Sequence, residues 1–419
     1  MKPQRPAALP FIFVTILLDV IGLGIILPVM PTLIEQLSGQ GISEAARYGG
    51  YLTFAYAAAQ FFCAPVIGGL SDRFGRRPVL LASLLGLGAD YVFLALAPTL
   101  GWLFVGRILA GVAGASFTTA TAYIADVSPP EKRAQNFGLV GAAFGLGFIL
   151  GPVLGGQVAH WGARAPFVVA AGLSLLNFLY GLLLVPESLP ESRRRAFEWK
   201  RANALASLAR LRLYPQIIGL VAALVLLYLA GSATQSVWTF YTILKFGWGE
   251  KLIGYSLGVV GLGALVVQGG LVRLLLPKLG TARAVVIGLL CYLAGFVLFA
   301  LASRSWHMFA ITGLYSLGGL AGPALQGSVS GQVPATEQGE LQGTLTSLIS
   351  ATGVVGPLLM TTLFAHFTEK GAPVYLPGAP FLLGAVLTGL ALLIAAGSLR
   401  RLPAGAAPLP PLAEATTGH

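Results

Sequence analysis

Charged residues are scarce in this sequence, and their scarcity excludes an ordinary soluble protein. Only 10% of the 419 residues are Asp, Glu, Lys or Arg, while 56% are hydrophobic. Soluble domains carry about 25% charged residues, because polar side chains have to cover a surface that faces water. With too little polar surface to cover a globule, the chain is predicted to lie in a membrane.

Cysteine is also rare, and its placement argues against a disulfide or a metal site. Cys63 and Cys291 both fall inside apolar runs, where they are expected to be small buried side chains. No spacing typical of zinc or haem binding occurs, and no Gly-x-x-x-x-Gly-Lys-Ser/Thr loop for ATP phosphates is found. We therefore expect no metal and no cofactor. No nucleophile, base and orienting group can be grouped within the spans, so an enzyme is not predicted.

Long apolar runs, by contrast, recur along nearly the whole chain. Crossing ~30 Å of hydrocarbon takes about 20 apolar residues in a helix. A membrane β-barrel would instead show alternating segments of about 10 residues. We predict an all-α membrane protein with twelve spanning helices near residues 10–37, 48–70, 78–98, 101–124, 135–160, 165–186, 215–244, 249–275, 280–301, 305–333, 338–366 and 377–399.

The basic residues are sorted between the loops. Most lie in alternate connections, at the N-terminus, 71–77, 132–133, 187–214, 273–283 and 400–401. The positive-inside rule then places both termini and the long middle loop in the cytoplasm. The net charge of +11 is thus accounted for by topology. Dispersed basic residues do not predict a nucleic-acid partner.

Glycine and proline residues recur at matching positions in the two halves of the chain. At one constant offset, Gly or Pro residues coincide at Pro129 and Pro334, Gly138 and Gly343, Gly151 and Gly356, Pro152 and Pro357, and Gly75 and Gly280. An offset of six spans gives parallel repeats, as in alternating-access carriers with a site near the membrane midplane. We predict six-helix bundles at 1–185 and 215–400, a cytoplasmic linker at 186–214 with an amphipathic helix near 196–212, and a disordered tail at 401–419.

Three ionisable residues lie well inside predicted spans: Asp19, Asp90 and Arg107. Such a side chain at membrane depth costs at least about 2.5 to 3.5 kcal/mol, so it usually faces a wet cavity and has a function. We hypothesise that Asp19 or Asp90 releases a proton when substrate enters and takes one again from outside. The alternative is a static pair of Asp90 with Arg107 that holds spans three and four together.

Polar and aromatic residues within the spans are candidates for binding a substrate. Apolar walls with a few amides suit an amphipathic aromatic compound. The alternative for each glutamine is an ordinary hydrogen bond between helices. The candidates are Gln60, Trp238, Gln268, Tyr292, Gln326 and Gln342, with Gln157, Gln235 and Tyr241 as further polar positions.

Two motifs concern conformation rather than binding. In "GGLSDRFGRRP", a carboxylate and guanidiniums at a helix end could form bonds in one arrangement that break in another, so we predict a conformational latch. The alternative is a solvated basic turn that only sets orientation. "GLGFILGPVLGG" predicts close, kinkable helix packing. The latch residues are Gly68, Asp72, Arg73, Gly75, Arg76 and Arg77, and the packing residues are Gly147, Gly151, Pro152, Gly155 and Gly156.

These motifs resemble those of the major facilitator superfamily. The latch sequence is similar to its cytoplasmic loop signature, and "LFVGRILAGVAGA" resembles its span-four arginine motif linked to proton coupling. "GLGFILGPVLGG" resembles the motif of exporters that exchange drug for proton. "LLDVIGLGIILPVMPTLIEQL", "ADYVFLALAP" and "VWTFYTILKFGW" look like segments of the bacterial tetracycline/proton antiporters.

The resemblance implies a fold and a set of roles. Asp19 and Asp90 match that family's intramembrane aspartates, Arg107 its arginine, and Gln60 a polar position in span two. The sequence departs from the pattern at Tyr292, where an aspartate is implied, and at Ala264, where a histidine is implied. Both departures remove titratable groups from the second half, which leaves the substrate open.

The predicted function is therefore proton-coupled export of a drug-like organic compound by alternating access. The expected partners are a small-molecule substrate, protons and the bilayer, with the proton gradient as energy source and a monomer as the working unit. The alternatives are uptake or facilitated diffusion of a metabolite, and a lipid-handling or receptor-like protein on the same scaffold.

Overall fold

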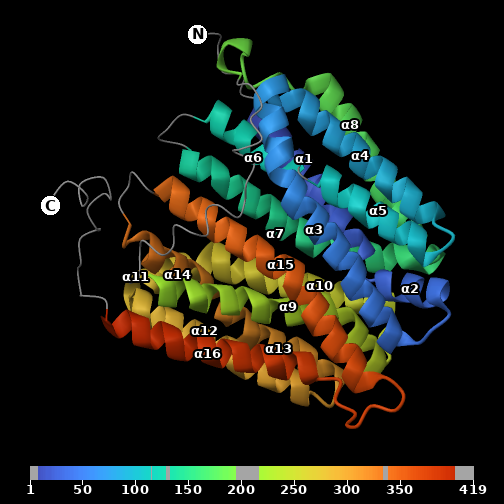
Figure 1. The fold of residues 1–419 in the computed structure, drawn as a ribbon, viewed down its shortest axis with the longest axis vertical. Coiled ribbons are helices and arrows are strands. Elements are labelled where there is room, and N and C mark those ends of the chain that lie inside the picture. The colour runs from blue at the N-terminus through green and yellow to red at the C-terminus, as the bar shows by residue number, and fades with distance from the viewer. Residues whose placement is uncertain (1–7, 115, 129–132, 195–216, 334–337, 402–419) are drawn as a thin grey trace. The chain divides into compact units, whose positions relative to one another are not determined.

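The described part of the chain is built from helices. The computed structural model describes residues 8–114, 116–128, 133–194, 217–333 and 338–401, and within them there is no β-strand (Figure 1). Eleven helical stretches are long and apolar enough to cross a membrane, and Leu100–Ala113 is a shorter apolar helix. The prediction of an all-α membrane protein is confirmed.

The chain forms two compact units. The first takes the described residues of Met1–Asn203 and Thr239–Leu262, and the second those of Ala204–Trp238 and Gly263–His419. The predicted bundle boundaries at 1–185 and 215–400 stay a prediction, since α9 (Ile218–Phe246) and α10 (Glu250–Val266) contribute to both units. The predicted linker helix near 196–212 and the tail beyond Arg401 lie outside the described residues.

The first unit contains the helices up to the linker. Its core lies where α1 meets α7 and α8, with α4 and α6 completing it. The elements are α1 (Ala8–Ile26), α2 (Met30–Ser38), α3 (Ile42–Phe74), α4 (Arg76–Leu96), α5 (Leu100–Ala113), α6 (Ser116–Val127), α7 (Arg133–Val158), η2 (Ala159–Trp161), α8 (Ala165–Leu184) and η3 (Glu191–Arg193).

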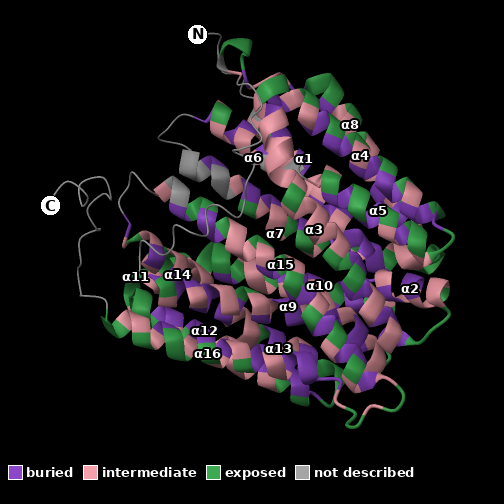
Figure 2. Cartoon of the chain, in the orientation of Figure 1, coloured by how far each residue is buried: buried purple, intermediate pink, exposed green. Residues whose placement is uncertain are grey.

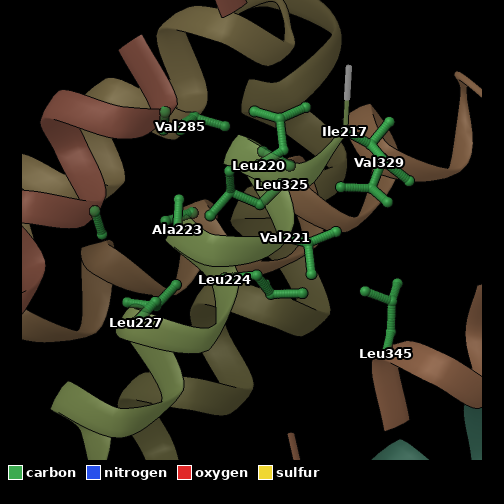
Figure 3. Close-up of a cluster of buried hydrophobic side chains, with 14 of the residues drawn as sticks. Ile217, Leu220, Val221, Ala223, Leu224, Leu227, Val285, Leu325, Val329 and Leu345 are labelled. Carbon is green, nitrogen blue, oxygen red and sulfur yellow. The ribbon is translucent and has the colours of Figure 1, made fainter. Parts of the chain in front are cut away.

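The second unit is centred on the first half of α9. Ile217, Leu220 and Leu224 are buried there among apolar side chains of other helices in the same unit, such as Val285 and Leu325 (Figure 3). The remaining elements are η6 (Val267–Leu271), α11 (Val272–Leu279), α12 (Thr281–Leu301), α13 (Ser305–Leu317), η7 (Gly318–Leu320), α14 (Ala321–Ser330), α15 (Gln338–Thr368) and α16 (Ala379–Arg401).

Two predicted spans are each broken into two helices. The first ends its initial helix at Ile26, because Pro28 in the following turn offers no amide to continue the ladder. The fourth is α5 followed by α6, with the break after Gly114. A helix end at membrane depth needs partners for its carbonyls. Gln60 supplies one, since its Nε2 donates to the Gly114 carbonyl at 3.2 Å.

Two spans of the second unit change their helical winding instead of breaking. Span eight passes from α10 through η6, a π-helical stretch, into α11. Span ten passes from α13 through the short 3₁₀ turn η7 into α14. Stretches of π-helix inside α-helices are frequent at functional sites.

Exposed residues occur on the helices of both units (Figure 2), and many of them are large and apolar. Leu96 and Leu183 in the first unit are 71% and 79% exposed, and Leu393 in the second is 71% exposed. A water-soluble monomer rarely exposes extended apolar surface, whereas lipid solvates it. The surface is thus that of a multi-pass membrane protein.

Candidate functional site

A buried ion pair joins α4 to α5. Arg107 Nη2 donates to Asp90 Oδ2 at 3.0 Å, and the two side chains are 9% and 0% exposed. Gly106 makes this approach possible, because a Cβ there would lie 3.0 Å from Asp90 Oδ1 and 2.6 Å from Leu94. The pair that the sequence offered as one alternative is present in this structure.

The pair is only partly satisfied. Asp90 Oδ1 and Arg107 Nε are buried, and within the described residues neither has a hydrogen-bond partner. A buried polar atom without a partner costs about 1 to 3 kcal/mol. One oxygen of Asp90 therefore remains open to a proton or to a hydrogen-bond donor.

Side chains of α3 line the other side of the arginine. The Arg107 guanidinium carbon lies 5.8 Å from the centre of the Tyr56 ring. Gln60, predicted as a binding residue, donates to the Tyr56 hydroxyl at 3.4 Å as well as to Gly114. Tyr56 was missed in the sequence, although it stands one helical turn before Gln60 on the same face.

Asp19 lies on α1 and is half-buried. Asn177 of α8 donates from Nδ2 to Asp19 Oδ1 at 3.3 Å and to the Thr15 carbonyl at 3.1 Å. The Asn177 side chain is fully buried, and sequence reasoning missed it. An asparagine in the middle of an apolar span was the signal that could have found it.

The ionisable residues of the first unit share one neighbourhood. Asp19, Asp90 and Arg107 all lie close enough to the Tyr56 hydroxyl to interact with it electrostatically. The structure therefore brings the three predicted proton-coupling residues together around one tyrosine.

The predicted latch lies in the sharp turn between α3 and α4. Gly75 has φ +104°, a backbone region that favours glycine, and a Cβ there would strike the Glu187 carboxylate. Arg76 is buried and binds three groups: Asp72 Oδ1 at 2.6 Å, Ser71 Oγ at 2.6 Å and Asp126 Oδ2 of α6 at 3.0 Å.

Glu187, just after α8, completes the latch. Its carboxylate accepts hydrogen bonds from the Arg76 amide at 2.9 Å and the Arg77 amide at 3.3 Å, the first two amides of α4. A negative charge at a helix N-terminus satisfies free amides and the helix dipole. Arg77 Nη2 also donates to the Leu182 carbonyl at 2.8 Å.

The remaining latch residues have fewer contacts, and the partners of the turn were not predicted from the sequence. Arg73 is exposed and lies over the Phe74 ring at 5.0 Å, and the Ser71 hydroxyl donates to the Gly68 carbonyl at 2.9 Å. Asp126 and Glu187 could have been noticed as acidic residues at the ends of spans four and six.

The five Gly and Pro residues of the predicted packing motif on α7 are all buried. A Cβ at Gly147 would strike Val20, one at Gly151 would strike the backbone of Gly24, and one at Gly155 would strike the Ile25 carbonyl. The motif therefore lets α7 lie against the backbone of α1, as small residues allow in membranes. On another face of α7, within the same unit, Gly156 lies against the backbone of Glu250 and the Pro152 carbonyl lies against Gly254.

The second unit contains a partly open cavity of about 300 Å³. Of the predicted binding residues, it brings together Gln268, Tyr292 and Gln326, with Gln235 from the further polar positions. Tyr228 and Tyr315 also line it and were missed. The lining is Leu227, Tyr228, Gly231, Gln235, Gln268, Tyr292, Phe296, Tyr315, Gly319, Gly322, Pro323 and Gln326.

Besides Gln60 in the first unit, two predicted binding residues lie outside this cavity. Trp238 is buried and packs edge-on against Phe299 at 5.2 Å. Gln342 is exposed and donates from Nε2 to Ser330 Oγ at 2.9 Å. Among the described residues, no group of three or more His, Cys, Asp or Glu side chains is placed to hold a metal ion.

Comparison with known proteins places this arrangement in a family. The family model of the Major Facilitator Superfamily matches residues 12–303. The Escherichia coli "Tetracycline resistance protein, class C" is 40% identical over 358 residues, which cover 85% of this chain and 90% of that protein. The class B protein of Escherichia coli is 37% identical over 350 residues, covering 84% of this chain and 86% of that protein.

Solved structures agree in fold. The human organic anion transporter MFSD10 (TETRAN) has a TM-score of 0.68 and 26% identity, over 94% of this chain and all of that chain. An inward-facing, occupied bacterial homologue of the human lysosomal transporter Spinster has a TM-score of 0.75 at 17% identity, over 97% of this chain and all of that chain. The predicted major facilitator fold is confirmed, and the chain belongs to the Major Facilitator Superfamily.

Proposed function

We propose that the protein exports a drug-like organic compound in exchange for protons, by alternating access. The observation that carries the proposal is the buried Asp90 and Arg107 pair, in which one carboxylate oxygen has no hydrogen-bond partner. Relatives named tetracycline resistance proteins, up to 40% identical, support a compound of tetracycline-like, amphipathic aromatic character.

The coupling step would use the first unit's own side chains. A proton that binds the Asp90 carboxylate turns it into a neutral acid and removes the counter-charge of Arg107. An unpaired guanidinium in a buried site is costly, so the protonated unit would favour a conformation that rehydrates or re-pairs it. Asp19, held by Asn177 from α8, would provide the second exchangeable site.

The latch would couple that change to the helix ends. Arg76 ties the end of α3 to α6 through Asp72 and Asp126, while Glu187 fixes the start of α4. These are charge-assisted bonds, which are strong when formed and lost together when the helix ends separate. The Gly and Pro residues of α7 would permit the sliding that such a rearrangement needs.

The charges of the loops indicate how the chain is oriented in the membrane. We propose that the chain lies in the bacterial inner membrane with both termini in the cytoplasm, since the basic residues gather in alternate loops. The proton gradient would supply the energy, no cofactor would be needed, and the working unit would be a monomer without catalytic activity. The latch would then lie at the cytoplasmic face.

Growth and vesicle assays test the proposal. An exporter-deleted bacterial host that carries this gene is grown on tetracyclines, fluoroquinolones, chloramphenicol and cationic dyes, and we expect protection against at least one class. Everted vesicles from the same cells should accumulate that compound when energised, which indicates export. Accumulation in right-side-out cells would instead support uptake, and no protection with no substrate-linked proton movement would contradict the proposal.

A further inference from the structure

Asn177 lies in the second half of α8, and its side chain is fully buried. A buried amide within a membrane span needs hydrogen-bond partners in the protein, because hydrocarbon offers none. Its Nδ2 donates to the Thr15 carbonyl at 3.1 Å and to Asp19 Oδ1 at 3.3 Å, two acceptors one turn apart on α1. Both hydrogens of the amide are therefore directed at α1.

The Thr15 carbonyl fixes which way the Asn177 amide faces. If the amide were turned over, its oxygen would lie 3.1 Å from the Thr15 carbonyl oxygen and 3.3 Å from the Asp19 carboxylate, so three acceptors would face one another. In the orientation present, Asn177 Oδ1 is buried without a hydrogen-bond partner among the described residues. The amide keeps this orientation although its own oxygen is left unpartnered, so Asp19 faces a donor in a fixed position.

A donor beside a carboxyl group acts differently on its two protonation states. The oxygens of a carboxylate only accept hydrogen bonds, so an N–H group aimed at one of them stabilises the ionised form. A proton on Oδ1 of Asp19 would meet that N–H group and would have to displace it. The Asn177 amide thus lowers the free energy of the ionised form relative to that of the neutral acid.

The charged groups near Asp19 come from α4 and α5. Asp19, Asp90 and Arg107 all interact electrostatically with the hydroxyls of Tyr56 and Tyr91. Asp90 and Arg107 are paired at 3.0 Å, so their charges oppose each other where they reach Asp19. Asn177, by contrast, acts on Asp19 through a direct contact.

The helices packed against α1 are α6, α7 and α8, and their titratable groups have other partners. On α6, the Tyr123 hydroxyl donates to the Pro186 carbonyl at 2.9 Å, and Asp126 binds Arg76. On α8, Tyr180 stacks at 4.7 Å on Phe11, two helical turns before Asp19. The side chains of α7 that the structure describes include no titratable group.

We propose that Asn177 is a positioning residue for the proton exchange, which favours the ionised form of Asp19, so that Asp19 gives up its proton at a lower pH than it would without the amide. This claim stands on the contacts of Asn177, and only its link to transport rests on the proposed function. The competing explanation is that the amide only joins α8 to the Thr15 carbonyl, as ordinary glue between helices. Its loss would then change stability but not the titration of Asp19.

Infrared titration of the full-length protein in nanodiscs, without substrate, tests the proposal. The carboxyl band of Asp19 is identified in each protein by subtracting the spectrum of the same protein with Asp19→Asn. Asn177→Leu keeps a side chain of similar volume but removes both N–H groups. We expect the titration midpoint of Asp19 to rise by about 1 pH unit, the effect of losing one hydrogen bond to a charged group. A midpoint equal to that of the parent would overturn the proposal.

Ser174→Ala is the matched control. Ser174 lies one turn before Asn177 on the same helix and is 2% exposed. The loss of its hydroxyl should leave the midpoint of Asp19 unchanged, whatever it does to stability. A shift as large as that of Asn177→Leu would mean that any disturbance of α8 changes Asp19, and it would contradict the assignment.

Asn177→Asp guards against misfolding of the leucine variant, because it keeps the shape of the parent side chain. Two carboxyl groups at this distance resist ionising together, and they titrate as a unit. We expect the pair to lose its last proton about 2 pH units above the parent midpoint. Loss of all protons at the parent midpoint would refute the contact with Asp19.

A transport assay separates this proposal from the proposed function. Nanodiscs without substrate carry out no transport, so the titrations do not depend on proton coupling. In proteoliposomes, Asn177→Leu should move the pH profile of substrate-driven proton movement upward by about as much as it moves the titration. A shifted titration with an unshifted profile would show that Asn177 acts on Asp19 but that Asp19 does not carry the transported proton, which would overturn the link to transport.

Discussion

Replacing one partner of a buried ion pair costs much stability. At the residue scale, Asp90 and Arg107 each depend on the other, since both side chains are almost fully removed from solvent. Replacing one partner leaves the other charge buried alone, whereas replacing both removes charge and counter-charge together. The pair therefore predicts a non-additive pattern of stability.

We expect Asp90→Asn and Arg107→Gln each to destabilise the protein by about 3 to 5 kcal/mol, and the double variant to be more stable than the less stable single variant. Thermal unfolding in detergent, followed by tryptophan fluorescence, measures the order of the midpoints. Glu44→Gln, in the partly exposed pair of Glu44 with Arg47, is the control and should change stability by less than about 1 kcal/mol. A double variant with the lowest midpoint of all would count against the pair.

At the element scale, the broken helices and capped ends decide how the spans are placed. The apolar runs predicted the spans well, because length and hydrophobicity depend on composition alone. The breaks at Pro28 and Gly114 were not predicted, since one depends on a turn and the other on Gln60 from a different helix. Asp126 and Glu187 were missed for the same reason, as their roles arise only when distant segments meet.

The start of α4 depends on an acid from beyond α8. Glu187→Ala should free the Arg76 and Arg77 amides and destabilise that end of the helix by about 1 kcal/mol. Hydrogen exchange followed by mass spectrometry should show faster exchange in peptides that cover residues 76–80. Glu191→Ala removes an acid whose side chain is 90% exposed, and it should leave that exchange unchanged. Equal exchange in the Glu187 variant and the parent would show that the cap has no effect.

The packing of α7 against α1 predicts a contrast between two glycines of one helix. Gly155→Ala forces a Cβ into the Ile25 backbone, while Gly141→Ala meets nothing within 4 Å. Since backbone cannot give way as a side chain does, we expect Gly155→Ala to destabilise by about 1 to 3 kcal/mol and to abolish transport. Gly141→Ala should be neutral in both the unfolding midpoint and vesicle transport. Similar behaviour of the two variants would argue against backbone packing.

At the scale of the whole molecule, the two units differ in the polar groups that they hold. The first unit holds Asp19, Asp90 and Arg107, and the second holds a cavity without charge. The sequence located the acids and four of the cavity side chains, because charged and polar residues stand out in apolar helices. It did not reveal which glutamines line the cavity and which bond to other helices, because that depends on how the helices pack.

The central claim, that buried acids of the first unit exchange protons for substrate, is tested most directly in proteoliposomes that enclose a pH-sensitive dye. The compound identified by the growth assay is added to the parent protein, to Asp19→Asn and to Asp90→Asn. We expect substrate-driven proton movement in the parent and a loss of about 10-fold or more in at least one variant, because an amide cannot take up a proton near neutral pH. Proton movement of parental size in both variants would contradict the account.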